Sequence, residues 1–383
     1  MSFKQVIEVY ELLDTPVIKG NQIKEFFLNR GIDESEIEMR KIKEDKGETE
    51  FIKIVIRGRD GLSEERKEAM PNGEKGEIIK AEKEGKSRGE DKGALEGEKG
   101  GKLKGEKEGK SKRGKEEEPK EENEGNSNAG ESNTDHAPTL GIIGRLGGIG
   151  ARPHKIGLVS DADGAITALA AAAKIATMRK KGDVLKGDII IATHLCPNSP
   201  IIPHEPVDFM DSPVSLETMN KYEVDERMEA ILSIDTTKGN RVINCRGFAI
   251  SPTLKDGYIL RVSEDLLDIM QIVTGKLPAV FPITTQDITP YGNDIYHLNS
   301  IMQPGNATSA PVVGAAITTE VPVPGCATGA NHTVDIEMAT RFVIEVAKAY
   351  GERKCSFYDE KEFQRLISLY GSLEHFKTLG GKN

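Results

Sequence analysis

A 64-residue segment from Asn72 to Asp135 divides this 383-residue chain and most limits what it can fold into. The segment carries 18 acidic side chains, 15 basic side chains and 13 glycines, with no aromatic residue. So few apolar groups cannot bury enough area to offset the entropy that is lost on ordering. We therefore predict a disordered insert that acts as a flexible spacer, since its mixed charge is not typical of a nucleic-acid-binding arm.

The folded part must come from the chain on either side of this insert. Before it, two apolar helical faces separated by Gly20 are followed by alternating stretches at 36–42 and 51–56, which are typical of half-buried strands. The predicted parts, in order, are 1–57 as a helix-helix-strand-strand part of the core, 58–71 as a transition, 72–135 as the insert and 136–383 as the main domain.

After the insert, buried strands alternate with helices. TLGIIG and GDIIIATHLCP have the continuous apolar character of strands that are buried on both faces. Helical patterns follow at 165–179, 332–350 and 360–370. The sequence therefore predicts an α/β fold with a mixed, mostly parallel central sheet and helices on both faces. In such folds chemistry gathers beyond the carboxyl ends of the strands.

Composition narrows the function classes. A formal net charge of −10 argues against nucleic-acid binding, and no apolar run approaches the roughly 20 residues that span a membrane. The cysteines are scattered and form no CxxC pair, which favours a cytoplasmic location. They are Cys196, Cys245, Cys326 and Cys355. The oligomeric state stays open, with a homo-oligomer as one option because a Pro-rich stretch at 197–213 could hide an apolar surface.

Polar residues stand where strands end and helices begin. In SDADG, Asp161 and Asp163 could bind a divalent cation or cap the following helix. Asp235 in SIDTTKGN could be a ligand or a turn residue, and His332 could be a ligand or a plain polar residue at a helix start. Carboxylate and imidazole are ligands that suit zinc.

His194 and Cys196 end a buried strand two residues apart. They could form a nucleophile and its base, two metal ligands, or simply a strand end. Weaker candidates are His204, Glu205, Asp294 and His297. The run GRLGGIGAR lacks the context of a dinucleotide-binding loop, and the sequence contains no GxxxxGK[ST].

Several long stretches resemble one family of bacterial and archaeal proteins known only as a domain of unknown function. They include TLGIIGRLGGIGARP, GDIIIATHLCPNSP, ILSIDTTKGNRVIN and VPGCATGANHTVDIE. The resemblance covers most of the chain outside the insert, and the insert is not part of the pattern. It implies no established activity.

The order of elements is also similar to that of the co-catalytic zinc aminopeptidases and deacylases. This more distant resemblance implies that Asp161 is the bridging carboxylate, Asp235 the third strand-end ligand and His332 the late histidine. Two departures are serious. Arg145-Leu146-Gly147 stands where the family has His-x-Asp, and Cys196-Pro197 stands where it has Glu-Glu. The general base of a two-zinc mechanism is therefore missing.

These features lead to a hypothesis of a hydrolase that acts on a small amide or peptide-like compound. One divalent metal, with zinc the first choice, would lie on Asp161, Asp235 and His332. His194 or Cys196 would supply acid–base chemistry or a further ligand, and Arg145 would anchor an anionic group of the substrate. One alternative is a non-catalytic descendant that binds a ligand or a partner. Another is cysteine-based hydrolysis through Cys196 and His194.

Overall fold

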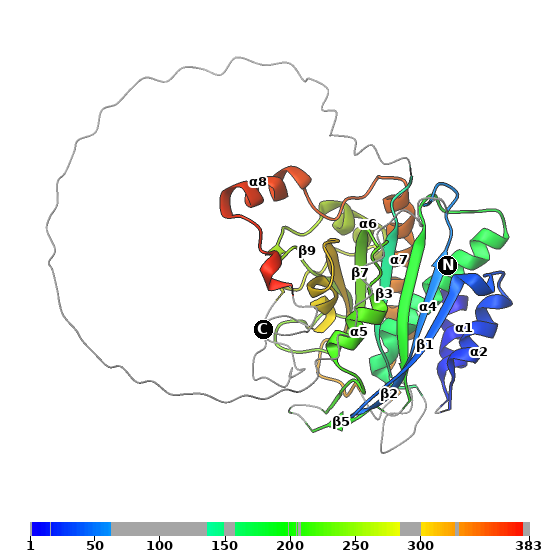
Figure 1. Ribbon diagram of the computed structural model, residues 1–383. Helices are drawn as coiled ribbons and strands as arrows, with labels where there is room; N and C mark the ends of the chain where they lie inside the picture. Colours follow the sequence, from blue (N-terminus) through cyan, green and yellow to red (C-terminus); the bar gives the residue numbers. More distant parts are fainter. Residues whose placement is uncertain are drawn as a thin grey trace, which may run out of the picture. The chain divides into compact units, whose positions relative to one another are not determined.

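A mixed β-sheet organises the described part of the chain (Figure 1). The computed structural model describes residues 2–15, 17–62, 136–148, 158–197, 199–203, 205, 208–283, 300–325 and 329–377. The predicted insert at 72–135 lies outside these residues, as does the first half of the strand expected just before Asp161. The described elements belong to one unit, formed by residues 1–67 and 134–383.

The sheet has nine described strands in the order β1-β2-β4-β3-β7-β11-β9-β10, with β8 also paired to β11. The pairs β4–β3, β3–β7 and β7–β11 are parallel, and the outer pairs are antiparallel. This confirms the predicted mixed sheet with parallel central strands. The strands are β1 (Ile37–Glu44), β2 (Gly47–Ile56), β3 (Leu140–Gly148), β4 (Ile189–Cys196), β7 (Ala230–Thr237), β8 (Gly247–Ile250), β9 (Leu254–Lys255), β10 (Tyr258–Ile259) and β11 (Val312–Thr318). Separately, β5 (Ile201–Ile202) pairs with β6 (Phe209–Met210).

Helices lie on both faces of the sheet, as the sequence predicts. On one face α4 packs against β3 and contacts α1 and α7, and α6 packs on α7. On the other face the short α5 and the 3-10 helix η3 contact each other, and η3 packs on β7 and β11. The helices are α1 (Phe3–Leu13), α2 (Gly20–Leu28), α4 (Asp163–Lys180), α5 (Leu216–Glu223), α6 (Glu264–Thr274), α7 (Thr333–Gly351) and α8 (Glu360–Tyr370), with the 3-10 helices η1 (Glu34–Glu36), η2 (Ser160–Ala162), η3 (Ser300–Asn306) and η4 (Glu374–Phe376).

A glycine of β3 and a glycine of α4 allow the helix to pack directly on the sheet. A Cβ atom at Gly144 would lie 2.5 Å from the carbonyl oxygen of Gly164, and one at Gly164 would lie 2.5 Å from the carbonyl oxygen of Ile234. Both distances are too short for a real side chain. The start of the glycine-rich run therefore serves helix–sheet packing, and the rest of that run, at 149–152, lies outside the described residues.

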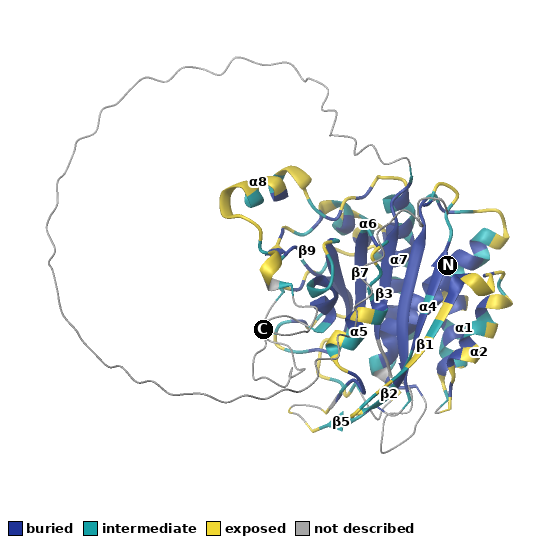
Figure 2. Ribbon diagram, in the orientation of Figure 1, coloured by how far each residue is buried: buried dark blue, intermediate teal, exposed yellow. Residues whose placement is uncertain are grey.

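Burial follows the predicted pattern (Figure 2). Every residue of β4 is buried, which confirms the expectation that this strand is covered on both faces. In contrast, α8 buries only Phe363 and is otherwise largely exposed. No helix in the described ranges is both long and apolar enough to cross a membrane. Cys196, Cys245 and Cys355 are free thiols, and Cys326 falls in a gap of the description.

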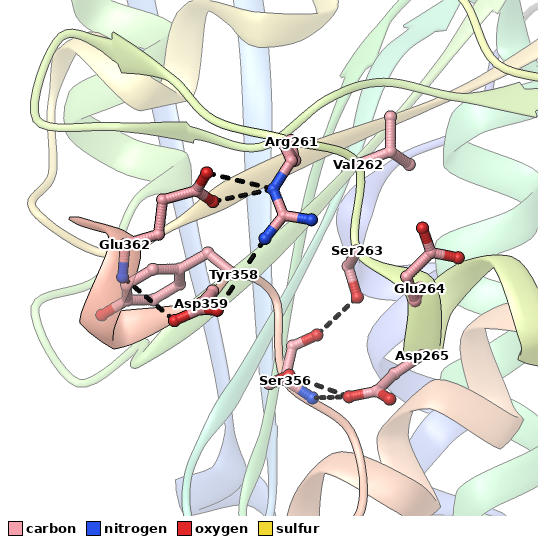
Figure 3. Close-up of a pocket in the computed structure, with 9 residues that line it drawn as sticks. All are labelled: Arg261, Val262, Ser263, Glu264, Asp265, Ser356, Tyr358, Asp359 and Glu362. Atoms are coloured by element: carbon pink, nitrogen blue, oxygen red, sulfur yellow. Dashed lines mark hydrogen bonds and ion pairs between the residues drawn. The ribbon is translucent and has the colours of Figure 1, made fainter. Parts of the chain in front are cut away.

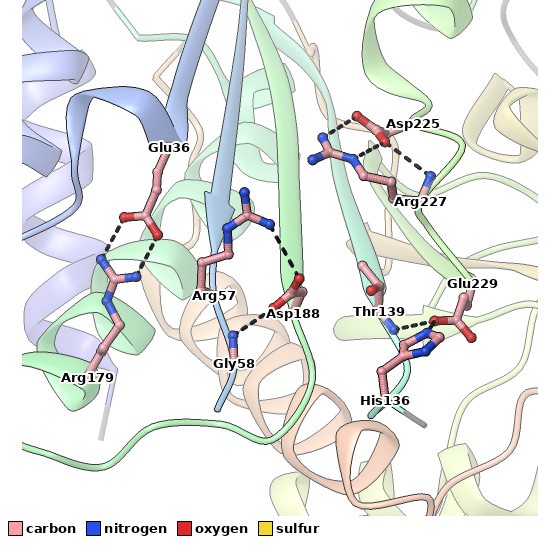
Figure 4. Close-up of polar contacts among 10 residues, drawn as sticks. All are labelled: Glu36, Arg57, Gly58, His136, Thr139, Arg179, Asp188, Asp225, Arg227 and Glu229. Carbon is pink, nitrogen blue, oxygen red and sulfur yellow. Dashed lines mark hydrogen bonds and ion pairs between the residues drawn. The ribbon is translucent and has the colours of Figure 1, made fainter. Parts of the chain in front are cut away.

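Several ion pairs lie at the amino end of the sheet (Figure 4). Arg179 of α4 donates from both terminal nitrogens to Glu36, at 2.7 and 2.8 Å. Arg227 donates to both oxygens of Asp225 at 2.7 and 2.8 Å, and Lys53 adds a third contact to Asp225 at 2.9 Å. The Arg179–Glu36 pair links α4 with η1. The Lys53–Asp225 contact links β2 with the residues just before β7.

Candidate functional site

Four of the buried polar side chains meet near the carboxyl ends of β3 and β4. We call Arg145, His194, Cys196 and Glu223 the thiol cluster. Successive side chains of a strand alternate between faces, so His194 and Cys196 share one face of β4. Gly144 of β3 pairs with Thr193 of β4, which brings Arg145 beside His194. All four side chains are at most 1% exposed.

Glu223, the last residue of α5, joins the two cationic side chains of the thiol cluster. Its Oε1 lies 2.5 Å from His194 Nδ1, and its Oε2 accepts a hydrogen bond of 2.9 Å from the Nη1 atom of Arg145. The same Nη1 atom donates to Asn220 Oδ1 at 3.2 Å. One carboxylate is thus shared between a guanidinium and an imidazole in a site that is closed to solvent.

This environment changes the protonation of His194. Burial alone lowers the pKa of its imidazole, but the neighbouring Cys196 and Glu223 more than reverse this effect and raise the pKa to about 10. The ring therefore carries a proton on both nitrogens at neutral pH. Nδ1 is engaged by Glu223, whereas Nε2 has no hydrogen-bond partner among the described residues. Because Nδ1 is engaged, Nε2 is the ring atom that is available to interact with Cys196.

Thr49 of β2 connects the thiol with an open pocket. Its hydroxyl donates to the carbonyl oxygen of Leu195 at 2.6 Å and lies 3.4 Å from the sulfur of Cys196. Thr49, Leu195 and Pro197 also line a pocket of about 450 Å³ between β2 and the residues before α2. The pocket therefore comes within one side chain of the thiol.

Asp235 lies on the same face of the sheet as the thiol cluster. Ile234 of β7 pairs with Gly144 of β3, which places Asp235 one strand away from Arg145. Asp235 Oδ1 accepts from the backbone N–H of Thr236 at 2.7 Å, and Oδ2 accepts from the hydroxyl of Ser300 at 3.4 Å. The structure thus brings Arg145, His194, Cys196 and Asp235 to one end of one face.

The other predicted ligands lie around a second buried pair, which we call the lysine cluster. Lys238 Nζ is 2.5 Å from Asp163 Oδ2, and Asn331 donates to Asp163 Oδ1 at 2.6 Å. His332, the N-cap residue of α7, is close enough for its charge to act on Asp163. Asp161 precedes this pair in η2, where its backbone N–H donates to the carbonyl oxygen of Gly325 at 2.8 Å.

The helix-capping alternative at Asp163 is wrong. The N-cap of α4 is Ala162, which makes no side-chain cap bond, because α4 begins at Asp163 and this carboxylate pairs with Lys238. Burial raises the pKa of Asp163, although Lys238 and Asn331 oppose this shift. At α7 His332 occupies the N-cap position without a side-chain cap bond, and Asn331 turns toward Asp163 and the carbonyl oxygen of Val159.

The predicted metal ligands do not form a cluster within the described part of the chain. Within the described ranges, no group of three or more His, Cys, Asp or Glu residues could hold a metal ion. The buried ammonium of Lys238 already supplies positive charge to Asp163. The ligand set Asp161, Asp235 and His332, and the zinc ion with it, therefore stay a prediction. Of the weaker candidates, Glu205 is exposed, and His204, Asp294 and His297 lie outside the described residues.

A second pocket, of about 250 Å³, lies between α6 and α8 (Figure 3). Its polar groups bond with one another: Arg261 Nε donates to Glu362 at 2.9 Å, and Asp265 accepts from the hydroxyl of Ser356 at 2.8 Å. It contains none of the residues that the sequence analysis singled out. We therefore take the thiol cluster as the candidate site.

Two residues of these clusters escaped the sequence analysis. Glu223 lies in MNKYEVDE, where no motif marks it, and only the position of α5 over the sheet brings it to His194. Lys238 is three residues beyond Asp235 in a stretch that we did single out. The signal that could have identified Lys238 is its position just after the end of a buried strand.

Solved structures give only distant likenesses to this chain. The bottromycin maturation enzyme BotP in complex with Mn is 11% identical, with a TM-score of 0.44, over 92% of this chain and 71% of that one. An Acidobacteriales bacterium glutaminyl cyclase is 11% identical, with a TM-score of 0.42, over 92% of this chain and 94% of that one. The Legionella pneumophila LapA aminopeptidase is 10% identical, with a TM-score of 0.39, over 94% and 71%. TM-scores below 0.5 carry no argument about function.

The family of the chain is shown by sequence. No curated protein matches it significantly. One family pattern matches residues 122–380, which include β3, β4, β7 and both clusters. Contrary to our expectation that the insert lies outside the pattern, the match begins within it, at residue 122. More than half of the chain is matched, and the chain belongs to the family described as Protein of unknown function (DUF1177).

Proposed function

We propose that this chain hydrolyses a small amide or peptide-like compound, with Cys196 as the nucleophile and His194 as its acid–base partner. The observation that carries the proposal is the contact of 2.5 Å between Glu223 and His194 Nδ1, two residues before Cys196 on the same face of β4. A thiol, an imidazole and an orienting carboxylate are the parts of a cysteine-type nucleophilic site.

Each side chain has a definite part in this scheme. Glu223 holds the imidazole in one orientation and stabilises its positive charge. In this scheme the imidazolium of His194 stabilises negative charge on the sulfur of Cys196. Thr49, whose hydroxyl lies 3.4 Å from the sulfur, also lines the 450 Å³ pocket. In the proposed reaction Arg145 stabilises Glu223 rather than touching the scissile bond.

The proposed reaction has two steps. The thiolate of Cys196 attacks the carbonyl carbon of the substrate, the C–N bond breaks, and His194 gives a proton to the departing amine. Water then attacks the resulting thioester with His194 as the base, which releases the acid and restores the thiolate of Cys196 and the imidazolium of His194. The balance is one amide and one water consumed for one acid and one amine formed.

Alkylation of the three described free thiols tests the proposal. Cys245 and Cys355 are internal controls, since burial raises the pKa of both, that of Cys355 to about 12. We expect iodoacetamide to modify Cys196 faster than either control at neutral pH, although Cys196 is fully buried. Peptide mass spectrometry would follow the three rates. A His194→Gln variant should remove the excess reactivity, whereas equal rates in the wild type would rule the proposal out.

A metal-dependent hydrolase is the second candidate function. It is favoured by His332, which acts on the buried Asp163 just after Asp161 in the chain, and by the contact of Asp163 with Lys238, which follows the strand β7 that carries Asp235. Metal analysis of the purified chain, with unfolding curves in the presence and absence of a chelator, tests it. Bound zinc in a stoichiometric amount, lost in an Asp235→Asn variant, would support this candidate. Absence of metal together with unchanged stability in chelator would exclude it.

A further inference from the structure

Four buried side chains on the α5 and η3 face of the sheet each keep a polar atom without a hydrogen-bond partner among the described residues. These atoms are Arg145 Nη2, His194 Nε2, Ser233 Oγ and Gln303 Nε2. The four side chains are between 0% and 5% exposed. Leaving one buried donor unsatisfied costs about 1–3 kcal/mol, and more for a charged group. Native structures rarely keep such atoms unless a ligand or ordered water meets them.

Hydrogen bonds and strand register place these atoms in one neighbourhood. Asn220 links two of the side chains, since it accepts from Arg145 at 3.2 Å and donates to the backbone carbonyl of Gln303 at 3.1 Å. Ser233 of β7 pairs with Ile143 of β3, two residues before Arg145. Arg145 and Ser233 therefore lie on adjacent strands of the same face, below η3.

The chemistry of these atoms selects a negatively charged acceptor. Gln303 Oε1 already accepts from Asn306 at 2.8 Å, so its free atom is the amide nitrogen, a donor. The free atom of Arg145 is also a donor, and a hydroxyl can donate as well. Each oxygen of Glu223 already accepts one hydrogen bond, one from His194 and one from Arg145. A carboxylate brings two acceptor oxygens in one plane, which matches a guanidinium edge.

We propose that Arg145, Gln303 and Ser233 bind a carboxylate of the substrate. The substrate class is then an N-acyl amino acid or short peptide whose free carboxylate lies near the scissile amide. This assignment of a substrate rests on the proposed hydrolase function, whereas binding of the carboxylate itself does not need the thiol.

Isothermal titration of the full chain with two matched probes tests the proposal. N-acetylglycine carries the carboxylate, and N-acetylglycinamide replaces it with an uncharged amide of nearly the same shape. We expect the acid to bind at least tenfold more tightly than the amide. Gln303→Met and Ser233→Ala should each raise the Kd of the acid severalfold to tenfold and leave that of the amide unchanged. Arg145→Gln should abolish the preference.

Thr139→Val is the matched control, since Thr139 also has a buried hydroxyl without a partner among the described residues but lies at the amino end of the sheet. It should bind the acid like the wild type. If Arg145→Gln does not fold, Gln303→Met and Ser233→Ala decide the question.

Equal affinity for both probes, or binding of neither, would overturn the proposal and leave ordered water as the partner of these atoms. Acid binding without selective alkylation of Cys196 would keep the carboxylate site and reject the hydrolase. Selective alkylation of Cys196 without preferential binding of the acid would keep the hydrolase and reject the carboxylate site.

Discussion

At the amino end of the sheet, Glu36 and Asp225 each form a two-point pair with one arginine, and Asp225 also meets Lys53 (Figure 4), whereas at the carboxyl end Glu223 gives one oxygen to each of two fully buried cations. Arg179 and Arg227 engage both oxygens of their partners. At the carboxyl end, by contrast, each of the two cations that share Glu223 keeps a buried nitrogen with no hydrogen-bond partner in the described part of the chain.

The difference separates a stabilising arrangement from one that is prepared for a ligand. The pair between Glu36 and Arg179 at the amino end joins elements that are distant in sequence and reaches partly into solvent, with the Arg179 side chain 19% exposed. In the thiol cluster, desolvation is complete and the hydrogen-bonding capacity of Arg145 and His194 is not used up by the described residues. Buried donors without partners lower the free energy of unfolding. Proteins keep such destabilising groups chiefly at functional sites.

The sharpest way to break this comparison is to remove the shared carboxylate. Glu223→Gln leaves Arg145 and His194 buried without a counter-charge, so we expect a loss of about 3–5 kcal/mol in the free energy of unfolding. Urea denaturation followed by circular dichroism would measure it. Glu36→Gln is the matched change at the amino end. The comparison fails if both variants lose the same amount.

The pH dependence of stability sharpens the comparison, with a smaller expected effect. The pKa of His194 is raised from its usual 6.5 to about 10 in the folded state. A raised folded-state pKa gives stability that is fully present below pH 6.5 and is lost as pH rises toward 10. The loss should be less than that of Glu223→Gln, because Glu223 keeps its bond to Arg145 when the imidazole loses its proton.

Unfolding free energies between about pH 6 and 10 would measure this effect. His194→Gln should give a flatter curve than the wild type in this window, since the group that titrates is gone. At the amino end of the sheet, the stability that Asp225 contributes should instead be lost in acid. Burial alone raises the pKa of Asp225, but Arg227 and Lys53 hold it well below its usual range, so its contribution disappears only as pH falls into strong acid. Parallel curves for the wild type and His194→Gln above pH 6.5 would contradict the role given to the imidazole.

Local patterns in the sequence were enough to predict much of the fold. The α8 helix runs from Glu360 to Tyr370 as predicted, and α4 and β4 lie where alanine content and apolar runs place them. The neighbourhood of His194 and Cys196 follows from the two-residue period of a strand. These features depend on residues that are close in sequence, where periodicity carries the information.

The partners of the site could not be predicted in the same way. Glu223 is 29 residues from His194, and its contact depends on where α5 lies over the sheet. Lys238 is 75 residues from Asp163, and its ammonium meets a carboxylate that we had interpreted as a metal ligand or a helix cap. Both contacts are set by tertiary packing of elements whose own patterns say only that they are helix or strand.

The smallest predicted effect concerns the amino end itself. Glu36→Gln removes one bidentate pair that is partly screened by solvent, and we expect a loss of about 1 kcal/mol, well below that of Glu223→Gln. Arg40→Gln, which breaks a pair whose side chains are 62% and 51% exposed, is the control and should leave the unfolding curve unchanged. The same urea titrations would rank all three variants. A loss at Glu36 as large as that at Glu223 would mean that the two ends of the sheet hold buried charge in the same way, and the functional interpretation of the unsatisfied donors would lose its physical basis.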